Sequence, residues 1–105
     1  MKVLVAGLLC GLLSVHSASA NQALAMSKNC MACHSVDQKI VGPAFSAVAA
    51  KYADDKSAPA TLAQKIQKGG SGVWGDMPMP PNASVSAADA KKLTTWILSQ
   101  TPKAP

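Results

Sequence analysis

Residues 30–34 read CMACH, inside the stretch MSKNCMACHSVDQ at residues 26–38. The chain has three cysteines, and two of them, Cys30 and Cys33, stand here with His34 directly after the second. Two cysteines at this spacing could form a short disulfide, a redox-active pair or thioether bonds to haem vinyl groups. The histidine favours haem, because one helical turn can place both sulfurs along a haem edge while the next imidazole reaches the iron.

The first twenty residues have the pattern of a secretory signal peptide. They open with Lys2, continue through an apolar run at residues 3–13 and end in Ala-Ser-Ala at residues 18–20, a small-residue cleavage pattern. The apolar run is too short to span a bilayer, and no later stretch approaches the roughly 20 apolar residues of a membrane helix. We therefore expect residues 1–20 to be cleaved and residues 21–105 to form one exported, periplasmic domain without a membrane anchor.

Cleavage after Ala20 leaves 85 residues, enough for one domain with a modest core. The full chain contains ten basic and five acidic residues, for a formal charge of +5, and every basic residue is a lysine. Loss of Lys2 leaves nine against five, a charge of +4. A surface without arginine argues against sequence-specific binding of nucleic acid, which relies on bidentate arginine. It suits weak electrostatic docking onto acidic proteins, and no feature demands more than a monomer.

A zinc site and a thioredoxin-type redox pair both fit the sequence less well than haem attachment does. A zinc site would need two further ligands, but residues 21–105 contain no third cysteine and no histidine besides His34. A thioredoxin-type pair would follow a strand in an α/β pattern, and no strand-rich pattern precedes this one. We therefore predict one haem c attached covalently through Cys30 and Cys33, with disulfide chemistry as the remaining alternative. The free energy of haem binding would contribute directly to the free energy of folding. We therefore expect the haem-free chain to be poorly folded.

The segment GDMPMPPN at residues 75–82 is the expected source of a second iron ligand. Proline fixes φ, has no N–H and pushes its predecessor toward extended conformations, which predicts a stiff non-helical strap. In electron-carrying haem proteins a methionine commonly occupies the axial position opposite a histidine. We predict Met79, which has proline on both sides, as the ligand opposite His34, with Met77 as the reserve. A proline-rich surface loop with methionine as a gap filler is the alternative.

Helical periodicity and end signals predict an all-α domain with four helices and no strong strand. The predicted helices cover residues 21–29, 43–52, 59–68 and 86–100. Ser86 is the expected N-cap of the last helix, and the glycine pair beginning at Gly69 ends the third. In the last helix, the face of Leu93, Trp96 and Ile97 should pack on the first helix and the haem.

Four glycines occur within residues 69–75, where the sequence reads GGSGVWG. Such a segment lets the backbone approach something large and flat. Trp74 within it has an indole N–H that needs an acceptor if the ring is buried. A haem propionate and plain packing are the two explanations that the residues leave open.

Four motifs together resemble the small monohaem class I cytochromes c of the bacterial cytochrome c-551 type. They are CMACH, VGPAF at residues 41–45, GVWGDMPMPPN at residues 72–82 and KKLTTWILSQ at residues 91–100. The resemblance extends over residues 24–100, and the VWGxxPMPPN pattern is far more specific than CxxCH. It implies the class I cytochrome c fold, an all-α wrap of about four helices around one covalently attached haem c.

The resemblance also implies roles for individual residues. Met79 corresponds to the sixth iron ligand of the family. The carbonyl of Pro43 would accept a hydrogen bond from the second ring nitrogen of His34 and so orient the imidazole. Trp74 would donate a hydrogen bond to a haem propionate, and Asn82 would steady the methionine ligand.

Three positions depart from the pattern of the family. Met77 stands in place of an aliphatic residue and leaves a second thioether two positions from Met79. Ser84 is a one-residue insertion. Lys65 occupies the place of a basic residue, often arginine, that helps to neutralise a propionate, and a lysine makes a less directional contact.

Two protein ligands on the iron leave no place for a substrate, so we expect an electron carrier rather than an enzyme. The haem edge beside residues 31–32 and 40–41 should be exposed, with Lys28 and Lys39 around it. The resemblance implies a quinol-oxidising cytochrome complex as electron donor and a nitrite reductase, terminal oxidase or peroxidase as acceptor. The alternatives are a haem-based gas sensor or peroxidase-like enzyme with an open iron site, and a haem-free binding module with a disulfide in CMACH.

Overall fold

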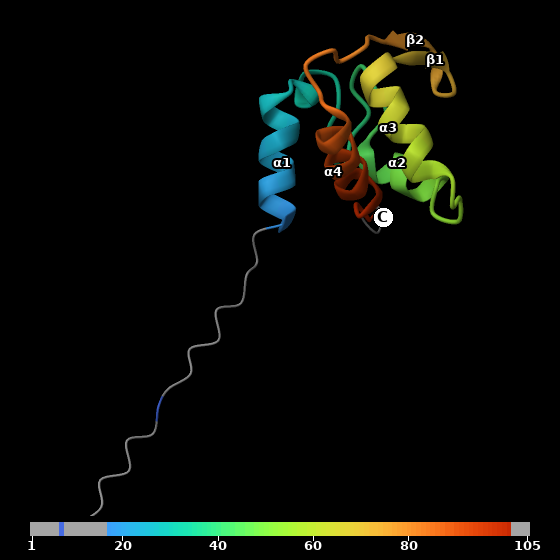
Figure 1. Cartoon of the computed structure of the whole chain (residues 1–105). Helices are drawn as coiled ribbons and strands as arrows, with labels where there is room; N and C mark the ends of the chain where they lie inside the picture. The colour runs from blue at the N-terminus through green and yellow to red at the C-terminus, as the bar shows by residue number, and fades with distance from the viewer. Residues whose placement is uncertain (1–6, 8–16, 102–105) are drawn as a thin grey trace, which may run out of the picture.

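Helices dominate the part of the chain that the computed structural model describes, which is Gly7 and residues 17–101 (Figure 1). In chain order the elements are α1 (Ser17–Ser27), the 3₁₀ turn η1 (Cys30–Ala32), α2 (Phe45–Lys51), α3 (Ala58–Lys68), β1 (Gly70–Gly72), β2 (Gly75–Met79) and α4 (Ala87–Leu98). The four predicted helices are all present, and a small two-stranded sheet accompanies them.

Most of the predicted signal peptide lies outside the described residues, and its cleavage stays a prediction. Helix α1 begins at Ser17, four residues before the predicted start at Asn21, so it includes the expected cleavage position after Ala20. No helix in the described ranges is both long and apolar enough to cross a membrane.

Two helices end or begin where the sequence signals indicate. Ser86 caps α4 as predicted, since its Oγ accepts a hydrogen bond from the Asp89 N–H at 3.1 Å. Helix α3 stops at Gly69, which has a φ of 73° that glycine adopts easily. The Gly69 N–H closes this end by donating to the Lys65 carbonyl at 2.8 Å.

Helix α2 begins at Phe45, two residues later than predicted. Ala44 before it is extended, with φ −59° and ψ 140°. The N–H groups of Phe45 and Ser46 then donate to the carbonyls of Ser35 and Val36, each at 2.9 Å. Because these first amide groups find partners outside the helix, the start of α2 is tied to the segment that follows CMACH.

A short hairpin forms in the glycine-rich segment, where the sequence showed no strong strand. Strands β1 and β2 pair antiparallel, with Gly70 opposite Met79 and Gly72 opposite Gly75. Gly72 and Gly75 have φ values of 96° and 109°, which permit the chain to reverse within two residues. The hairpin is held by its backbone and has no alternation of apolar and polar side chains, so the sequence carries no period-2 signal. The strap at Met79 is extended, as predicted, but it belongs to this hairpin.

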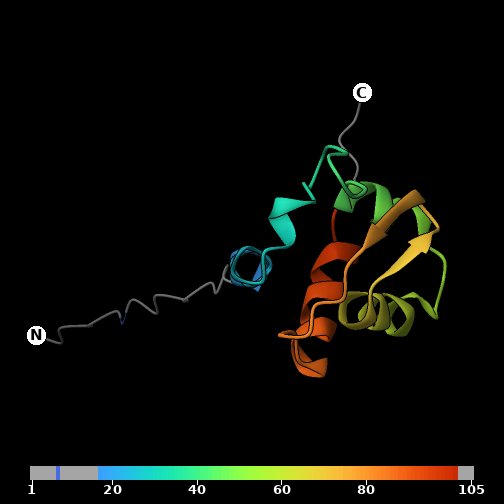
Figure 2. The same ribbon diagram turned by 90° about the horizontal axis from the view of Figure 1, so that it is seen from above.

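Helix α4 lies at the centre of the packing and contacts α1, α2 and α3. From above, α1 lies on one side of α4 and the hairpin on the other (Figure 2). Leu93, Trp96 and Ile97 are buried, and α1 packs against their helix as predicted. Trp96 meets Phe45 of α2 edge to face, with ring centroids 5.4 Å apart.

Thr94 is a polar residue in this core, 1% exposed, and its Oγ1 has no hydrogen-bond partner within the described residues. A buried hydroxyl without a partner loses its hydration and gains nothing in return. We therefore expect Thr94→Val, which keeps the shape of the side chain, to raise the free energy of unfolding by about 1 kcal/mol. Chemical denaturation of the mature protein measures the change.

Thr95→Val is the matched control on the next position of α4. Thr95 is exposed, and its Oγ1 donates to the Lys91 carbonyl at 3.0 Å, so the same substitution there should leave stability unchanged or slightly lower it. A loss of stability in Thr94→Val comparable to that of a core truncation would contradict the assignment of an unpaired hydroxyl.

Candidate functional site

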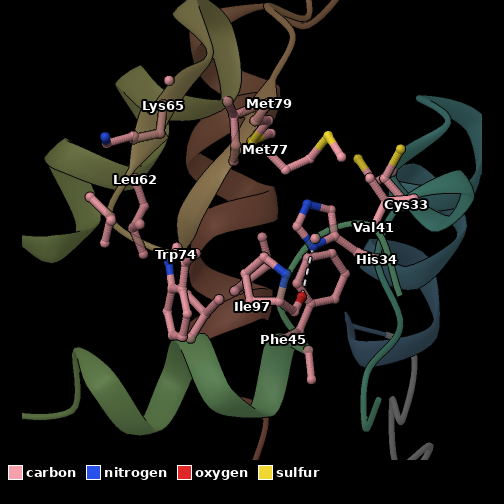
Figure 3. A pocket seen from close by; sticks show the side chains of 18 of the residues that line it. Cys33, His34, Val41, Phe45, Leu62, Lys65, Trp74, Met77, Met79 and Ile97 are labelled. Carbon is pink, nitrogen blue, oxygen red and sulfur yellow. Dashed lines mark hydrogen bonds between the residues drawn. The ribbon is translucent and has the colours of Figure 1, made fainter. Parts of the chain in front are cut away.

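A cavity of about 660 Å³ opens between α2, α3, α4, the hairpin and the turn η1. Apolar side chains form most of its wall. All eight residues predicted for the site line it: Cys30, Cys33, His34, Pro43, Lys65, Trp74, Met79 and Asn82. Cys33 and His34 lie on one side, Leu62, Lys65 and Trp74 lie on the opposite side, and Met77 and Met79 lie at the edge between them (Figure 3).

The two cysteines are carried by a tight turn. The carbonyl of Cys30 accepts hydrogen bonds from the N–H groups of Cys33, at 3.2 Å, and His34, at 3.0 Å. Asn29 before the turn has a left-handed φ of 62°, which ends α1 and redirects the chain into the turn. Both thiols are free and half-buried, and burial raises the pKa of the Cys30 thiol, partly offset by a backbone hydrogen bond. The turn therefore presents two free thiols to one cavity.

The imidazole of His34 is held on three sides. Its Nδ1 lies 2.8 Å from the Pro43 carbonyl, which fixes Nδ1 as the protonated donor and leaves the lone pair on Nε2 free (Figure 3). The ring stacks on Phe45, with centroids 4.8 Å apart and an interplanar angle of 19°. A Cβ at Gly42 would run into the imidazole ring, so glycine is needed there. The hydrogen bond to Pro43 is the one that the family resemblance implied.

The strap that carries Met79 is held by its backbone and by one amide side chain. Met79 is half-buried at the end of β2, whereas Met77 is 67% exposed. A Cβ at Gly69 would collide with the Met79 carbonyl, so this glycine lets the strap pass close to the end of α3. Asn82 donates from its backbone N–H and from Nδ2 to the Ile66 carbonyl, at 3.2 Å and 2.8 Å. Asn82 is thus bonded to α3 and fixes the strap three residues after Met79.

Polar groups gather at the end of the cavity away from the cysteines. Trp74, in the turn of the hairpin, is 40% exposed, and Lys51 Nζ lies 5.5 Å from the centre of its ring, within the range of a cation–π contact. Lys51 also lies 6.0 Å from the Tyr52 ring. The side chain of Lys65 covers Gly70 on the same wall. Sequence reasoning missed Lys51, because nothing in the one-letter sequence separates it from the other lysines.

The donor set suits a large flat cofactor better than a bare ion. The described residues contain no group of three His, Cys, Asp or Glu side chains that could hold a metal ion by themselves. The cavity instead joins two free thiols, an imidazole with one free nitrogen, and a thioether within an apolar wall. These groups fit a macrocycle that brings four ligands of its own and leaves two axial positions to the protein.

Comparisons with known proteins point to one family. Residues 18–101 match the family model described as Cytochrome c. The chain is 57% identical over 82 residues to cytochrome c-552 of Nitrosomonas europaea, which covers 78% of this chain and 80% of that protein. It is 55% identical over 82 residues to cytochrome c-551 of Allochromatium vinosum, covering 78% and 87% of the two chains. The crystal structure of wild-type Nitrosomonas europaea cytochrome c552 has a TM-score of 0.74 at 56% identity, covering 76% of this chain and 99% of that one.

We expect Gly42→Ala to be strongly destabilising, because the new methyl group would push the His34 ring away from the Pro43 carbonyl. Overpacking of this kind costs about 1–3 kcal/mol, and the lost hydrogen bond adds to it. Denaturant unfolding of the purified variant measures the loss.

Gly70→Ala is the matched control for this substitution. A Cβ at Gly70 would meet the Lys65 side chain, 3.1 Å from Nζ, and that flexible chain can move aside. Equal losses of stability in the two variants would mean that His34 is not the group that requires glycine at position 42.

Proposed function

Because the chain belongs to the cytochrome c family and carries one covalently attached haem c, we propose that it is a periplasmic carrier that moves single electrons between larger respiratory proteins. Family membership makes it an electron-transfer cytochrome rather than an enzyme. The haem supplies a one-electron Fe(II)/Fe(III) couple when bound. The tasks of the polypeptide are to hold the haem, to occupy both axial positions and to exclude water.

The observation that carries this proposal is that His34 and Met79 line the same cavity as the two free thiols (Figure 3). We assign Cys30 and Cys33 to the thioether bonds and Nε2 of His34 to one axial position. The hydrogen bond from Nδ1 to Pro43 supports this assignment, since it fixes the tautomer and raises the basicity of the free nitrogen. We assign the thioether of Met79 to the opposite axial position.

Three further residues complete the proposed site. Trp74 and Lys65 stand at the polar end of the cavity, where an indole N–H and an ammonium group can meet the carboxylates of the haem. Asn82 acts on Met79 through the strap, by holding the following residues to α3. Half-buried Met79 is preferred over Met77 because a ligand must stay inside the cavity, and Met77 is 67% exposed.

Partners would dock where the cysteine-bearing side of the cavity reaches the surface. Ile40 and Val41 are 49% and 50% exposed there, and exposed Lys39 stands beside them. A small apolar patch with a positive neighbour favours fast, short-lived complexes with acidic partners. We propose a quinol-oxidising cytochrome complex as donor and a nitrite reductase, terminal oxidase or peroxidase as acceptor. Export by a signal peptide at residues 1–20 would place the carrier in the periplasm with them.

Visible absorption spectra of the exported protein, oxidised and reduced and with and without CO, test the central assignment. A low-spin c-type spectrum with a methionine-to-ferric-iron band and no response to CO is expected for two protein ligands. A high-spin or CO-reactive haem would overturn the closed site and favour a sensor or peroxidase-like function.

We expect Met79→Ala to lower the reduction potential by on the order of 100 mV, within the ~0.8 V range over which axial ligands act. The physical reason is that the thioether stabilises Fe(II) relative to Fe(III). The same variant should bind CO in the reduced state. Potentiometric titration and CO difference spectra measure both effects.

Met77→Ala is the matched control, since it removes a thioether two positions away in the same strand. It should keep the spectrum and nearly the same potential as the parent protein. If Met77→Ala changes the ligation and Met79→Ala does not, the axial position belongs to Met77.

A further inference from the structure

Lys28 makes a hydrogen bond across the molecule. It directly follows α1, two residues before Cys30, and its Nζ donates to the Ser84 carbonyl at 3.0 Å, although the two residues are 56 positions apart. Ser84 lies in the loop between the Met79 strap and α4. The side chain of Lys28 is only half-exposed, whereas that of Lys39, on the other side of CMACH, is exposed. The ammonium group of Lys28 therefore has a partner in the protein, at an exposed position.

The loop that receives Lys28 is held from its other side by α3. Asn82 bonds twice to the Ile66 carbonyl, and Gln67 Nε2 donates to the Val85 carbonyl at 3.2 Å. The Val85 N–H closes the loop on the Asn82 carbonyl at 3.1 Å, and Val85 itself is 3% exposed. The bond from Lys28 comes from the α1 side. It thus joins the segment with Cys30 and His34 to the segment that follows Met79.

We propose that Lys28 is a positioning residue that fixes the Met79 strap relative to the turn with Cys30 and His34. The inference rests on the proposed function, in which His34 and Met79 occupy the two axial positions. Those ligands lie 45 positions apart in the chain. The distance between them in the folded protein therefore depends on contacts between the two segments. The acceptor is an exposed carbonyl, and a charge-assisted hydrogen bond to it restrains the loop that follows the strap.

The position of Ser84 supports this role. Ser84 stands two residues after Asn82, whose two hydrogen bonds to the Ile66 carbonyl hold the end of the strap to α3.

Imidazole binding to the oxidised holoprotein tests the proposal. Added imidazole can bind only when Met79 has left the iron, so its apparent affinity reports the fraction of molecules with a detached strap. Lys28→Met keeps the apolar stem and removes the ammonium group. We expect imidazole to bind Lys28→Met about tenfold more tightly, together with a weaker methionine-to-iron band, as the loss of one charge-assisted hydrogen bond implies.

Two control variants separate this effect from the loss of a charge. Lys28→Arg keeps a cationic donor and should stay within about twofold of the parent protein. Lys39→Met removes the same charge beside the other end of CMACH and should also leave imidazole affinity within about twofold, because Lys39 is exposed. Deletion of Ser84 removes the acceptor and should reproduce the effect of Lys28→Met.

The outcomes separate the two proposals. If Lys28→Met melts at a lower temperature but binds imidazole like the parent, Lys28 only stabilises the fold and the positioning role is wrong. The same conclusion follows if Lys39→Met raises imidazole affinity as much as Lys28→Met does. If Met79→Ala leaves imidazole binding and the spectrum unchanged, the ligand assignment itself fails, independently of Lys28.

Discussion

The hydrogen bond between His34 and the Pro43 carbonyl is the interaction on which the rest of the cavity depends. It requires the chain to fold back within nine residues, and glycine at position 42 makes room for the imidazole. The chain is extended at Ala44, directly after the accepting carbonyl, so α2 begins at Phe45 and that ring lies against the imidazole. Since Phe45 in turn meets Trp96 edge to face, one orientation of His34 is linked through aromatic contacts to the central helix α4.

The opposite wall is organised by a different principle. His34 is fixed by packed rings, but the strap with Met79 is fixed mainly by the backbone pairing of the hairpin and by polar contacts at and just after its C-terminal end. A proline-rich strand loses little conformational entropy when it is ordered, so a few hydrogen bonds suffice to hold it. The position of such a wall can depend on single residues outside the cavity. Asn82 and Lys28 can therefore influence the position of Met79 through contacts that involve the residues after it.

The sequence predicted the parts of the structure that depend on local chemistry. CMACH, the proline-flanked Met79 and the Ser86 cap are recognisable because each is defined by a few neighbouring residues. Resemblance to a family added the pairing of Pro43 with His34, which the structure contains. The hairpin was missed because glycines paired through their backbone leave no side-chain pattern. Lys28 was expected to lie at the edge of a docking surface. Its hydrogen bond to Ser84, 56 positions away, could not be predicted without the fold.

The size of the cavity supports the expectation that the haem-free chain is poorly folded. About 660 Å³ lies open between mostly apolar walls in a small domain. The whole stability of such a domain is only about 5–15 kcal/mol, and each large apolar side chain left in water instead of being buried forgoes about 1.5–3 kcal/mol. A macrocycle that fills the cavity covers these walls, so its binding free energy adds directly to the stability of the fold. The contacts of His34 and Met79 would then be stabilised by the same binding event that makes them ligands.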